Sequence, residues 1–220
     1  MSTVLIDYGA GNLHSVHKAL QKAGFVVERS ADPAAAARAD ALVLPGQGHF
    51  RQVMEAFLAS GFEPVVRDHL AAAKPFLGIC VGLQLLMEGS EEAPGLPGLG
   101  VIRGRVKRFS AEGVSVPQMG WNSIHPYGDP PLLDGIEDGA FCYFANSYYV
   151  DFAADIPGAT TRYGSVTFKS AVSQAHLHAT QFHPEKSQAV GLRILGNFRR
   201  LADGGERGSG VGARDSGFGA

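Results

Sequence analysis

The sequence predicts an α/β fold: a mostly parallel sheet with helices on both faces, plus a smaller antiparallel sheet. In the first half of the chain, short apolar runs alternate with segments of helical periodicity, and the connections between them are short. This alternation favours right-handed crossovers between parallel strands. From about residue 95 onward, glycine and proline become denser and β-rich runs follow one another, which favours antiparallel strands.

The expected elements follow the chain in order. In the first half, strands are expected at residues 4–6, 25–27, 41–44 and 76–79, and helices at 13–23, 33–39, 50–59 and 62–73. In the second half, β-rich runs cover 101–109, 140–150, 160–168 and 171–178, and a helix with an apolar stripe covers 192–201. We expect one domain over residues 1–202 and a flexible, glycine-rich tail over 203–220.

The composition gives no sign of a nucleic-acid-binding, membrane or disulfide-rich protein. The chain has 220 residues, 45% of them hydrophobic, and a formal net charge of −2. This charge gives no reason to expect nucleic acid or a membrane surface as a partner. The two cysteines, Cys80 and Cys142, form no disulfide framework, which favours a reducing compartment. The first residues enter an apolar strand with no leader pattern, and no apolar run could span a bilayer, so we expect a cytoplasmic protein.

Cys80 carries the strongest chemical signal. It follows the apolar run 76–79, is flanked by Gly78 and Gly82, and is followed at once by a helix-like apolar stretch. This pattern is typical of a nucleophile elbow, a sharp strand-to-helix turn that presents a reactive side chain at the edge of a sheet. A helix N-terminus favours a thiolate over a thiol. The alternative is a buried structural cysteine, which is the interpretation that we give Cys142.

A base for this thiol is expected near residue 183. A strand ending at Phe182 would place His183 at the carboxyl edge of the sheet, where Cys80 also lies. Pro184 would end the strand, and Glu185 could reach back to orient the His183 ring. A third strand end, at Gly46-Gln47-Gly48, could turn backbone N–H groups inward as a nest for an oxyanion. Alone, each segment has an ordinary structural explanation; together they indicate acyl transfer at one sheet edge.

These segments resemble the triad glutamine amidotransferases. The Gly-x-Cys-x-Gly elbow followed by a glutamine and the late His-Pro-Glu are typical of that superfamily. Within it, the chain is similar to the glutaminase subunits of imidazole glycerol phosphate synthases, and the similarity covers residues 3 to about 201. The segments that carry this closer resemblance are residues 6–13, 45–50, 119–122 and 182–187.

The resemblance implies roles for individual residues. Cys80 would attack the side-chain carboxamide of glutamine, His183 would move the protons and Glu185 would orient His183. The oxyanion would be held by the backbone of Val81 and of the Gly46, Gln47, Gly48 loop. The glutamine would contact Gln84, Ser147 and Tyr148, although Asn146 stands where relatives often have a histidine. Four residues are candidates for the surface that faces a separate cyclase: Asn12, Trp121, Tyr143 and Lys186.

The same resemblance implies a heterodimer with the cyclase subunit of imidazole glycerol phosphate synthase and no cofactor. Ammonia released from glutamine would pass to the cyclase, a separate (β/α)8 barrel, in histidine biosynthesis. This chain has too few strands for such a barrel and no phosphate-binding fingerprint, so it would not carry the cyclase reaction itself. Three alternatives remain open at this stage. The chain could serve another glutamine-dependent synthase, or be a cysteine peptidase on the same scaffold. It could also be a metal-binding module built on His176, His178 and His183.

Overall fold

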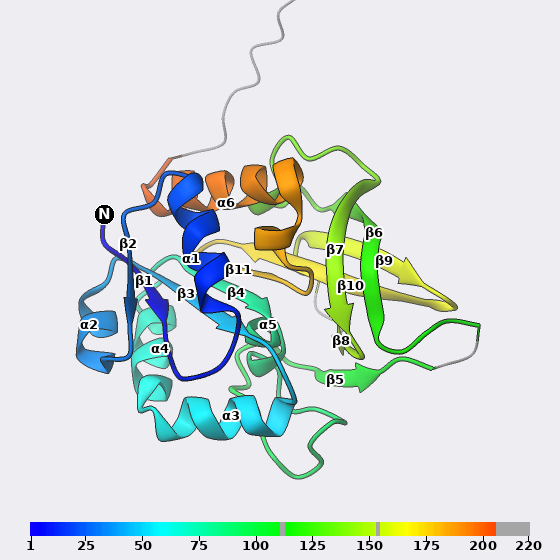
Figure 1. The fold of residues 1–220 in the computed structure, drawn as a ribbon, viewed down its shortest axis with the longest axis horizontal. Coiled ribbons are helices and arrows are strands. Elements are labelled where there is room, and N and C mark those ends of the chain that lie inside the picture. Colours follow the sequence, from blue (N-terminus) through cyan, green and yellow to red (C-terminus); the bar gives the residue numbers. More distant parts are fainter. Residues whose placement is uncertain (111–112, 153–154, 206–220) are drawn as a thin grey trace, which may run out of the picture.

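The computed structural model describes residues 1–110, 113–152 and 155–205. Its centre is an 11-stranded sheet whose main path runs in the order β2-β1-β3-β4-β11-β10-β9-β6-β7 (Figure 1). The first five strands of this path are parallel to one another. They are β2 (Val27–Ser30), β1 (Thr3–Ile6), β3 (Ala41–Gly46), β4 (Phe76–Cys80) and β11 (Leu177–Thr180). Their carboxyl ends lie along one edge of the sheet, as the alternating pattern predicts.

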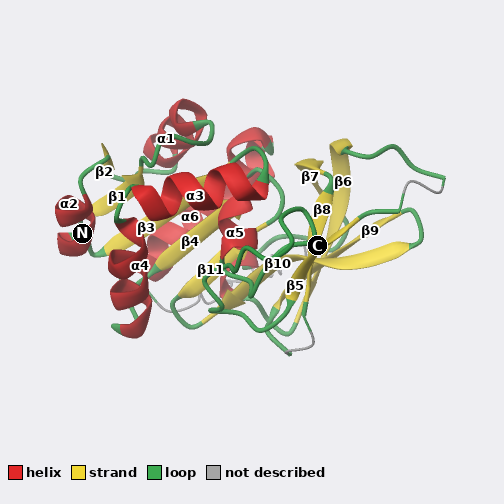
Figure 2. Ribbon diagram, turned by 90° about the horizontal axis from the view of Figure 1, so that it is seen from below, coloured by secondary structure: helices red, strands yellow, loops and turns green. Residues whose placement is uncertain are grey.

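The helices cover both faces of this parallel half. Helices α1 and α6 contact each other on one face, whereas α2, α3, α4 and α5 form a connected group on the other (Figures 1 and 2). Their bounds are α1 Leu13–Lys22, α2 Pro33–Arg38, α3 Phe50–Ala59, α4 Phe62–Ala71, α5 Val81–Leu85 and α6 Gln188–Ala202. Asn12, Asp32 and His49 cap the first turns of α1, α2 and α3 through their side chains.

The second half of the chain extends the same sheet with antiparallel strands. Strands β10, β9, β6 and β7 continue the path beyond β11, while β8 branches from β10 and β5 pairs with β8. Their bounds are β5 Arg105–Arg108, β6 Gln118–Tyr127, β7 Ala140–Asn146, β8 Tyr148–Asp151, β9 Gly158–Tyr163 and β10 Val166–Gln174. Two short 3-10 helices, η1 (Pro131–Leu133) and η2 (Pro184–Lys186), complete the described elements.

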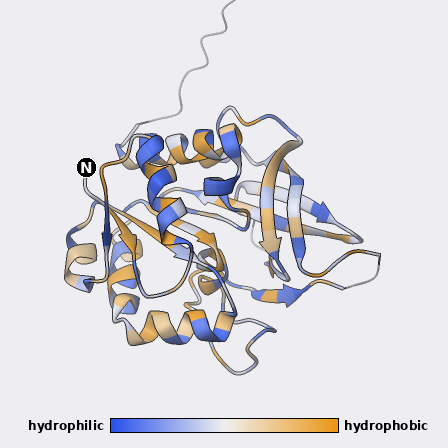
Figure 3. Cartoon of the chain, viewed as in Figure 1, coloured by the Kyte–Doolittle hydropathy of each residue, from blue (hydrophilic) through white to orange (hydrophobic). Residues whose placement is uncertain are grey.

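Hydrophobic residues concentrate where the layers meet. Strands β1, β3 and β4 are buried along their whole length, because helices cover both of their faces. Figure 3 shows helices that carry both hydrophobic and hydrophilic residues, as expected for elements with one face on the sheet. Phe25 and Phe198 stack at 5.8 Å between ring centroids and join the start of β2 to α6.

The structure corrects several expected boundaries. The second strand begins at Val27 rather than residue 25, because Phe25 is buried against α6 while Val26 is 86% exposed. The run 101–109 contains strand only at Arg105–Arg108, and the run 171–178 spans the turn between β10 and β11. The ten-residue strand β6 was not predicted at all, because Gly120 and Pro126 interrupt its pattern.

The domain boundaries remain a prediction. Helix α6 ends at Ala202, and residues 206–220 of the predicted tail lie outside the described residues. None of the described helices is long and apolar enough to cross a membrane.

Candidate active site

Cys80 occupies a strained turn between β4 and α5. Its backbone has φ +55° and ψ −109°, a conformation that side-chain-bearing residues rarely adopt. The turn ends the strand and starts the helix at the same residue, so the side chain projects from the sheet edge. Helix α5 has only five residues, so its macrodipole is small. The free backbone N–H groups at the start of α5, rather than the dipole of a long helix, can stabilise a negative charge at the elbow.

The flanking glycines allow the elbow to fit against the sheet. A Cβ at Gly82 would overlap the carbonyl oxygen of Leu44 in β3. A Cβ at Gly78 would lie 3.0 Å from the carbonyl oxygen of Gly82, which is tighter than normal contact. Gly46 pairs with Cys80 in the β3–β4 ladder, and a Cβ there would lie 2.8 Å from the backbone nitrogen of Gly82. The close approach of α5 to β3 therefore requires glycine at these positions.

The structure brings His183 and Glu185 to the same sheet edge as Cys80. Strand β11 lies beside β4 and ends at Thr180, and η2 begins at Pro184. The Nδ1 atom of His183 lies 2.8 Å from Oε1 of Glu185, and the two side chains are only 3% and 1% exposed. Because a carboxylate can only accept, Nδ1 carries the proton and Nε2 is the nitrogen left for chemistry. Among the described residues, Nε2 has no hydrogen-bond partner.

Electrostatics keep His183 protonated. Burial alone would lower the pKa of His183, but the charge of Cys80 and the interaction with its sulfur, followed by the hydrogen bond and charge of Glu185, outweigh burial and raise this pKa to about 10. The arrangement therefore favours an imidazolium at position 183 at neutral pH, beside the Cys80 sulfur. The other cysteine is different, because burial raises the pKa of the Cys142 thiol to about 12.

The loop after β3 lies beside the nucleophile. Gly46 is the last residue of β3, and Gln47 and Gly48 line a cavity together with Cys80 and Val81. The hydroxyl of buried Tyr8 donates to the carbonyl oxygen of Pro45 at 2.6 Å. This hydrogen bond ties the start of the loop to β1.

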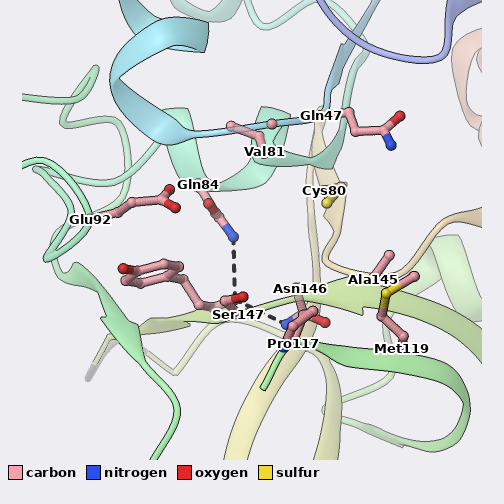
Figure 4. Close-up of a pocket in the computed structure, with 12 residues that line it drawn as sticks. Gln47, Cys80, Val81, Gln84, Glu92, Pro117, Met119, Ala145, Asn146 and Ser147 are labelled. Carbon is pink, nitrogen blue, oxygen red and sulfur yellow. Dashed lines mark hydrogen bonds between the residues drawn. The ribbon is translucent and has the colours of Figure 1, made fainter. Parts of the chain in front are cut away.

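The cavity has a volume of ≈ 360 Å³. Figure 4 shows the Cys80 sulfur pointing into it, between the side formed by Gln47 and Val81 and the side formed by Pro117 and Asn146. A volume of this size suits a small molecule. The remaining lining residues are Gly48, Gln84, Glu92, Met119, Ala145, Ser147 and Tyr148.

The predicted glutamine contacts share this cavity. The Nε2 group of Gln84 donates to the carbonyl oxygen of Tyr148 at 3.3 Å, and Asn146 Nδ2 donates to the same oxygen at 3.0 Å (Figure 4). Asn146 Oδ1 is buried and has no partner among the described residues.

Sequence reasoning missed Glu92 and Gln181. Glu92 comes from a loop, where its Oε2 accepts from the backbone N–H of Phe50 at 2.7 Å and its carboxylate lines the cavity. Gln181, two residues before His183, lies fully buried next to Cys80. The position of Gln181 beside the His-Pro-Glu segment was the only available signal for it, and no sequence signal marked Glu92.

Three of the four predicted partner-facing residues lie together. Trp121 and Tyr143 are opposite each other in the β6–β7 ladder, with ring centroids 6.1 Å apart, and Lys186 Nζ lies 5.5 Å from the Tyr143 ring centroid. Trp121 is 46% exposed and is therefore not a core residue. The fourth residue, Asn12, caps α1, where its Oδ1 accepts from Ser15 N at 3.4 Å.

The metal-binding alternative finds no support. His178 Nδ1 lies 3.0 Å from the hydroxyl of Ser173, which in turn accepts from Leu132 N, so this ring is engaged in the core. Within the described ranges, no group of three histidine, cysteine or acidic side chains could hold a metal ion.

The chain matches one known protein family over nearly its whole described length. A family model described as "Glutamine amidotransferase class-I" matches residues 4–200, and the chain belongs to this family. Two solved structures share the fold. A "Crystal structure of glutamine amidotransferase" has a TM-score of 0.72 at 20% identity and covers 91% of this chain and 98% of its own. The glutaminase domain of Trypanosoma brucei CTPS has a TM-score of 0.67 at 16% identity, covering 94% and 95%.

The curated relatives narrow the class further. "Imidazole glycerol phosphate synthase subunit HisH" of Deinococcus radiodurans is 56% identical over 201 residues, which cover 90% of this chain and 92% of the relative. The protein of the same description from Thermus thermophilus is 52% identical and covers 91% and 98%. The sequence thus groups with the HisH subunits, in agreement with the resemblance noted from its motifs.

Proposed function

We propose that this chain is the glutaminase subunit of imidazole glycerol phosphate synthase. It would hydrolyse glutamine to glutamate and ammonia and deliver the ammonia to a partner cyclase in histidine biosynthesis. The names of its relatives support the pathway. The single observation that carries the chemistry is the buried His183–Glu185 pair at 2.8 Å, on the same sheet edge as the strained Cys80 elbow.

The residues account for both halves of the reaction. The Cys80 thiolate attacks the carboxamide carbon of glutamine, and the electron pair moves to the oxygen. Backbone N–H groups of Val81 and of the 46–48 loop would stabilise this oxyanion. His183 donates the Nε2 proton to the leaving nitrogen, so that ammonia departs and a glutamyl thioester forms. His183 then takes a proton from water, which attacks the thioester and releases glutamate and the thiol.

The cavity offers polar groups for both ends of the substrate. Gln84, Ser147 and Tyr148 would contact the glutamine, as the family resemblance implies. We further propose that the Glu92 carboxylate attracts the α-ammonium group, because it is an acidic side chain in the cavity wall. The ≈ 360 Å³ volume suits a single amino acid better than the extended chain that a peptidase must bind.

The partner surface would be the outer face of β6 and β7. Met119 and Trp121 alternate along β6, and Phe141 and Tyr143 along β7, so these four side chains share one face of the hairpin. Met119, Trp121 and Phe141 are 67%, 46% and 58% exposed, which is unusual for large apolar side chains. Met119 also lines the cavity, so ammonia formed at Cys80 would leave beside this face.

Glutamate release by the purified chain tests the proposal. We expect slow release alone and at least about tenfold faster release when the cyclase and its ribotide ligand are present, because an ungated glutaminase would waste glutamine. Equal turnover with and without the cyclase would contradict the gated role. Hydrolysis of peptides, or activation by a different synthase, would favour one of the alternative activities.

A further inference from the structure

Gln181 connects the nucleophile to the substrate pocket. It follows β11, and its backbone N–H donates to the carbonyl oxygen of Ser170 at 2.8 Å. Its side chain is fully buried and makes two contacts. Nε2 donates to Cys80 Sγ at 3.6 Å, and Oε1 accepts from Gln84 Nε2 at 3.1 Å. One side chain therefore touches both the proposed nucleophile and a proposed glutamine contact.

The orientation of this amide is fixed by a backbone group. The carbonyl oxygen of Tyr148 can only accept, so the Gln84 atom that faces it at 3.3 Å must be the NH₂ group. The same NH₂ group faces Gln181, which must therefore present its oxygen there. The NH₂ group of Gln181 is left to face Cys80 Sγ. A flip of either amide would bring two donors or two acceptors together.

An amide N–H in this place favours the charged form of the sulfur. Hydrogen bonds to ionised acceptors are stronger than those to neutral ones, so the donor stabilises a thiolate more than a thiol. The contact also restrains Sγ on the side of the cavity where Gln84 lies. His183 acts on the same sulfur from the opposite end of the short segment 181–183.

We propose that Gln181 is a positioning residue that holds the Cys80 thiolate ready for attack and links its placement to Gln84. The proposal rests on the glutaminase function proposed above. A purely structural role would require only that the buried amide be satisfied. A positioning role additionally requires that the reactivity of Cys80 depend on the Gln181 amide.

The test is alkylation of Cys80 by iodoacetamide, measured by mass spectrometry across pH 5–9 without substrate. Gln181→Met keeps the length and approximate volume but removes the donor. We expect alkylation at pH 7 to slow by about tenfold, with the profile moved to higher pH, because a hydrogen bond to a charged group is lost. Buried Cys142 will not compete, since burial raises the pKa of its thiol to about 12.

Two further variants make the result decisive. Gln181→Glu keeps the shape and an oxygen for Gln84, and once its carboxyl is ionised it replaces the donor with an acceptor, so at the alkaline end of the range it should slow alkylation more than Gln181→Met. The Tm of each variant is measured alongside. Ser170→Ala is the control, because it removes a buried hydrogen bond from Thr161, 2.8 Å long, on the neighbouring strand. It should lower the Tm without moving the alkylation profile.

Steady-state kinetics with the cyclase complex completes the test. Gln181→Met should lower the kcat for glutamine by about tenfold and change KM less. A folded Gln181 variant with the wild-type alkylation profile and kcat would overturn the inference. If the wild-type chain hydrolyses no glutamine, the proposed function fails instead, while the alkylation profiles still decide whether Gln181 controls Cys80.

Discussion

The backbone N–H of His183 donates to the carbonyl oxygen of Tyr143 at 2.9 Å. A second link runs through Ser187, whose hydroxyl accepts from Tyr143 N at 3.0 Å and donates to His183 O at 2.7 Å. Tyr143 belongs to the strand that carries the proposed partner surface. The proposed base and the proposed partner surface are therefore joined by short hydrogen bonds, through which partner binding would reach His183.

Trp121→Ala should weaken the complex with the cyclase. Trp121 is half-exposed and packs edge-on against Tyr143, an arrangement typical of an interface anchor. We expect the Kd for the cyclase to rise by about 30-fold or more, with the Tm nearly unchanged because little core is lost. Isothermal titration calorimetry measures the first quantity and calorimetric unfolding the second.

Val26→Ala is the matched control, because Val26 is 86% exposed and lies beside β2, at the opposite end of the sheet. If Trp121→Ala binds the cyclase as tightly as Val26→Ala does, the β6–β7 face is not the partner surface.

Glu185→Gln should narrow the pH range of activity. The pKa of His183 is raised to about 10 despite burial, by the charge of Cys80 and by Glu185, so the imidazolium is present at neutral pH and is lost only as the pH rises toward 10. Removing the Glu185 charge removes part of this increase. The alkaline limb of kcat/KM should therefore move down by about one pH unit, with kcat about 10- to 100-fold lower. An alkaline limb at the wild-type position would show that Glu185 does not tune His183.

Acidification should destabilise the fold through His178. Burial, chiefly, lowers the pKa of His178 from 6.5 to about 4, so between these values the unfolded chain binds a proton that the folded chain does not. Stability is therefore complete above about pH 7 and falls as the pH drops from 6.5 to about 4. The loss attributable to His178 is on the order of 3 kcal/mol.

Urea unfolding of the wild type and of His178→Asn between pH 7.5 and 4.5 measures this slope. Asparagine can still accept from Ser173 but does not titrate, so the stability of the His178→Asn protein should fall less as the pH drops. If the free energy of unfolding falls equally with pH in the two proteins, His178 does not cause the loss of stability in acid.

Gly82→Ala should disrupt the elbow. The new Cβ would overlap the carbonyl oxygen of Leu44, so α5 or β3 must move. We expect a loss of about 3 kcal/mol or more, a Tm lower by about 6 to 12 °C, and little glutaminase activity. Gly196→Ala is the control, because a Cβ there meets nothing within 4 Å and Gly196 lies inside α6. It should gain about 0.5–1 kcal/mol; equal effects of the two changes would contradict this account of the elbow.

The sequence contained most of the information about the parallel half of the fold. Local patterns mark β1, β3 and β4, and the glycines around Cys80 mark the elbow, because each feature depends on neighbours in the chain. The gathering of Cys80 with the 181–185 segment was predictable because parallel strands share a carboxyl edge. Strand β6 escaped prediction because Gly120 and Pro126 break its alternation, although pairing with β7 and β9 overrides their low propensity.

The details of the site were less predictable. Glu92 reaches the cavity from a loop, and its carboxylate accepts from the backbone N–H of Phe50, a long-range contact that no local pattern encodes. Gln181 has the sequence environment of an ordinary strand end, and only the tertiary contacts with Cys80 and Gln84 distinguish it. Asn12 caps α1 through its side chain, a role that we did not predict from the sequence, and its partner role stays a prediction.

The central claim is that Cys80 generates the ammonia that the cyclase consumes. Its most direct test is synthesis of imidazole glycerol phosphate by the complex of the cyclase with Cys80→Ala, with glutamine or with ammonium chloride at alkaline pH as the nitrogen source. We predict that product formation from glutamine falls by about 1,000-fold or more, whereas product formation from ammonium stays at the wild-type rate. Glutamine-dependent synthesis at a wild-type rate by the Cys80→Ala complex would contradict the account.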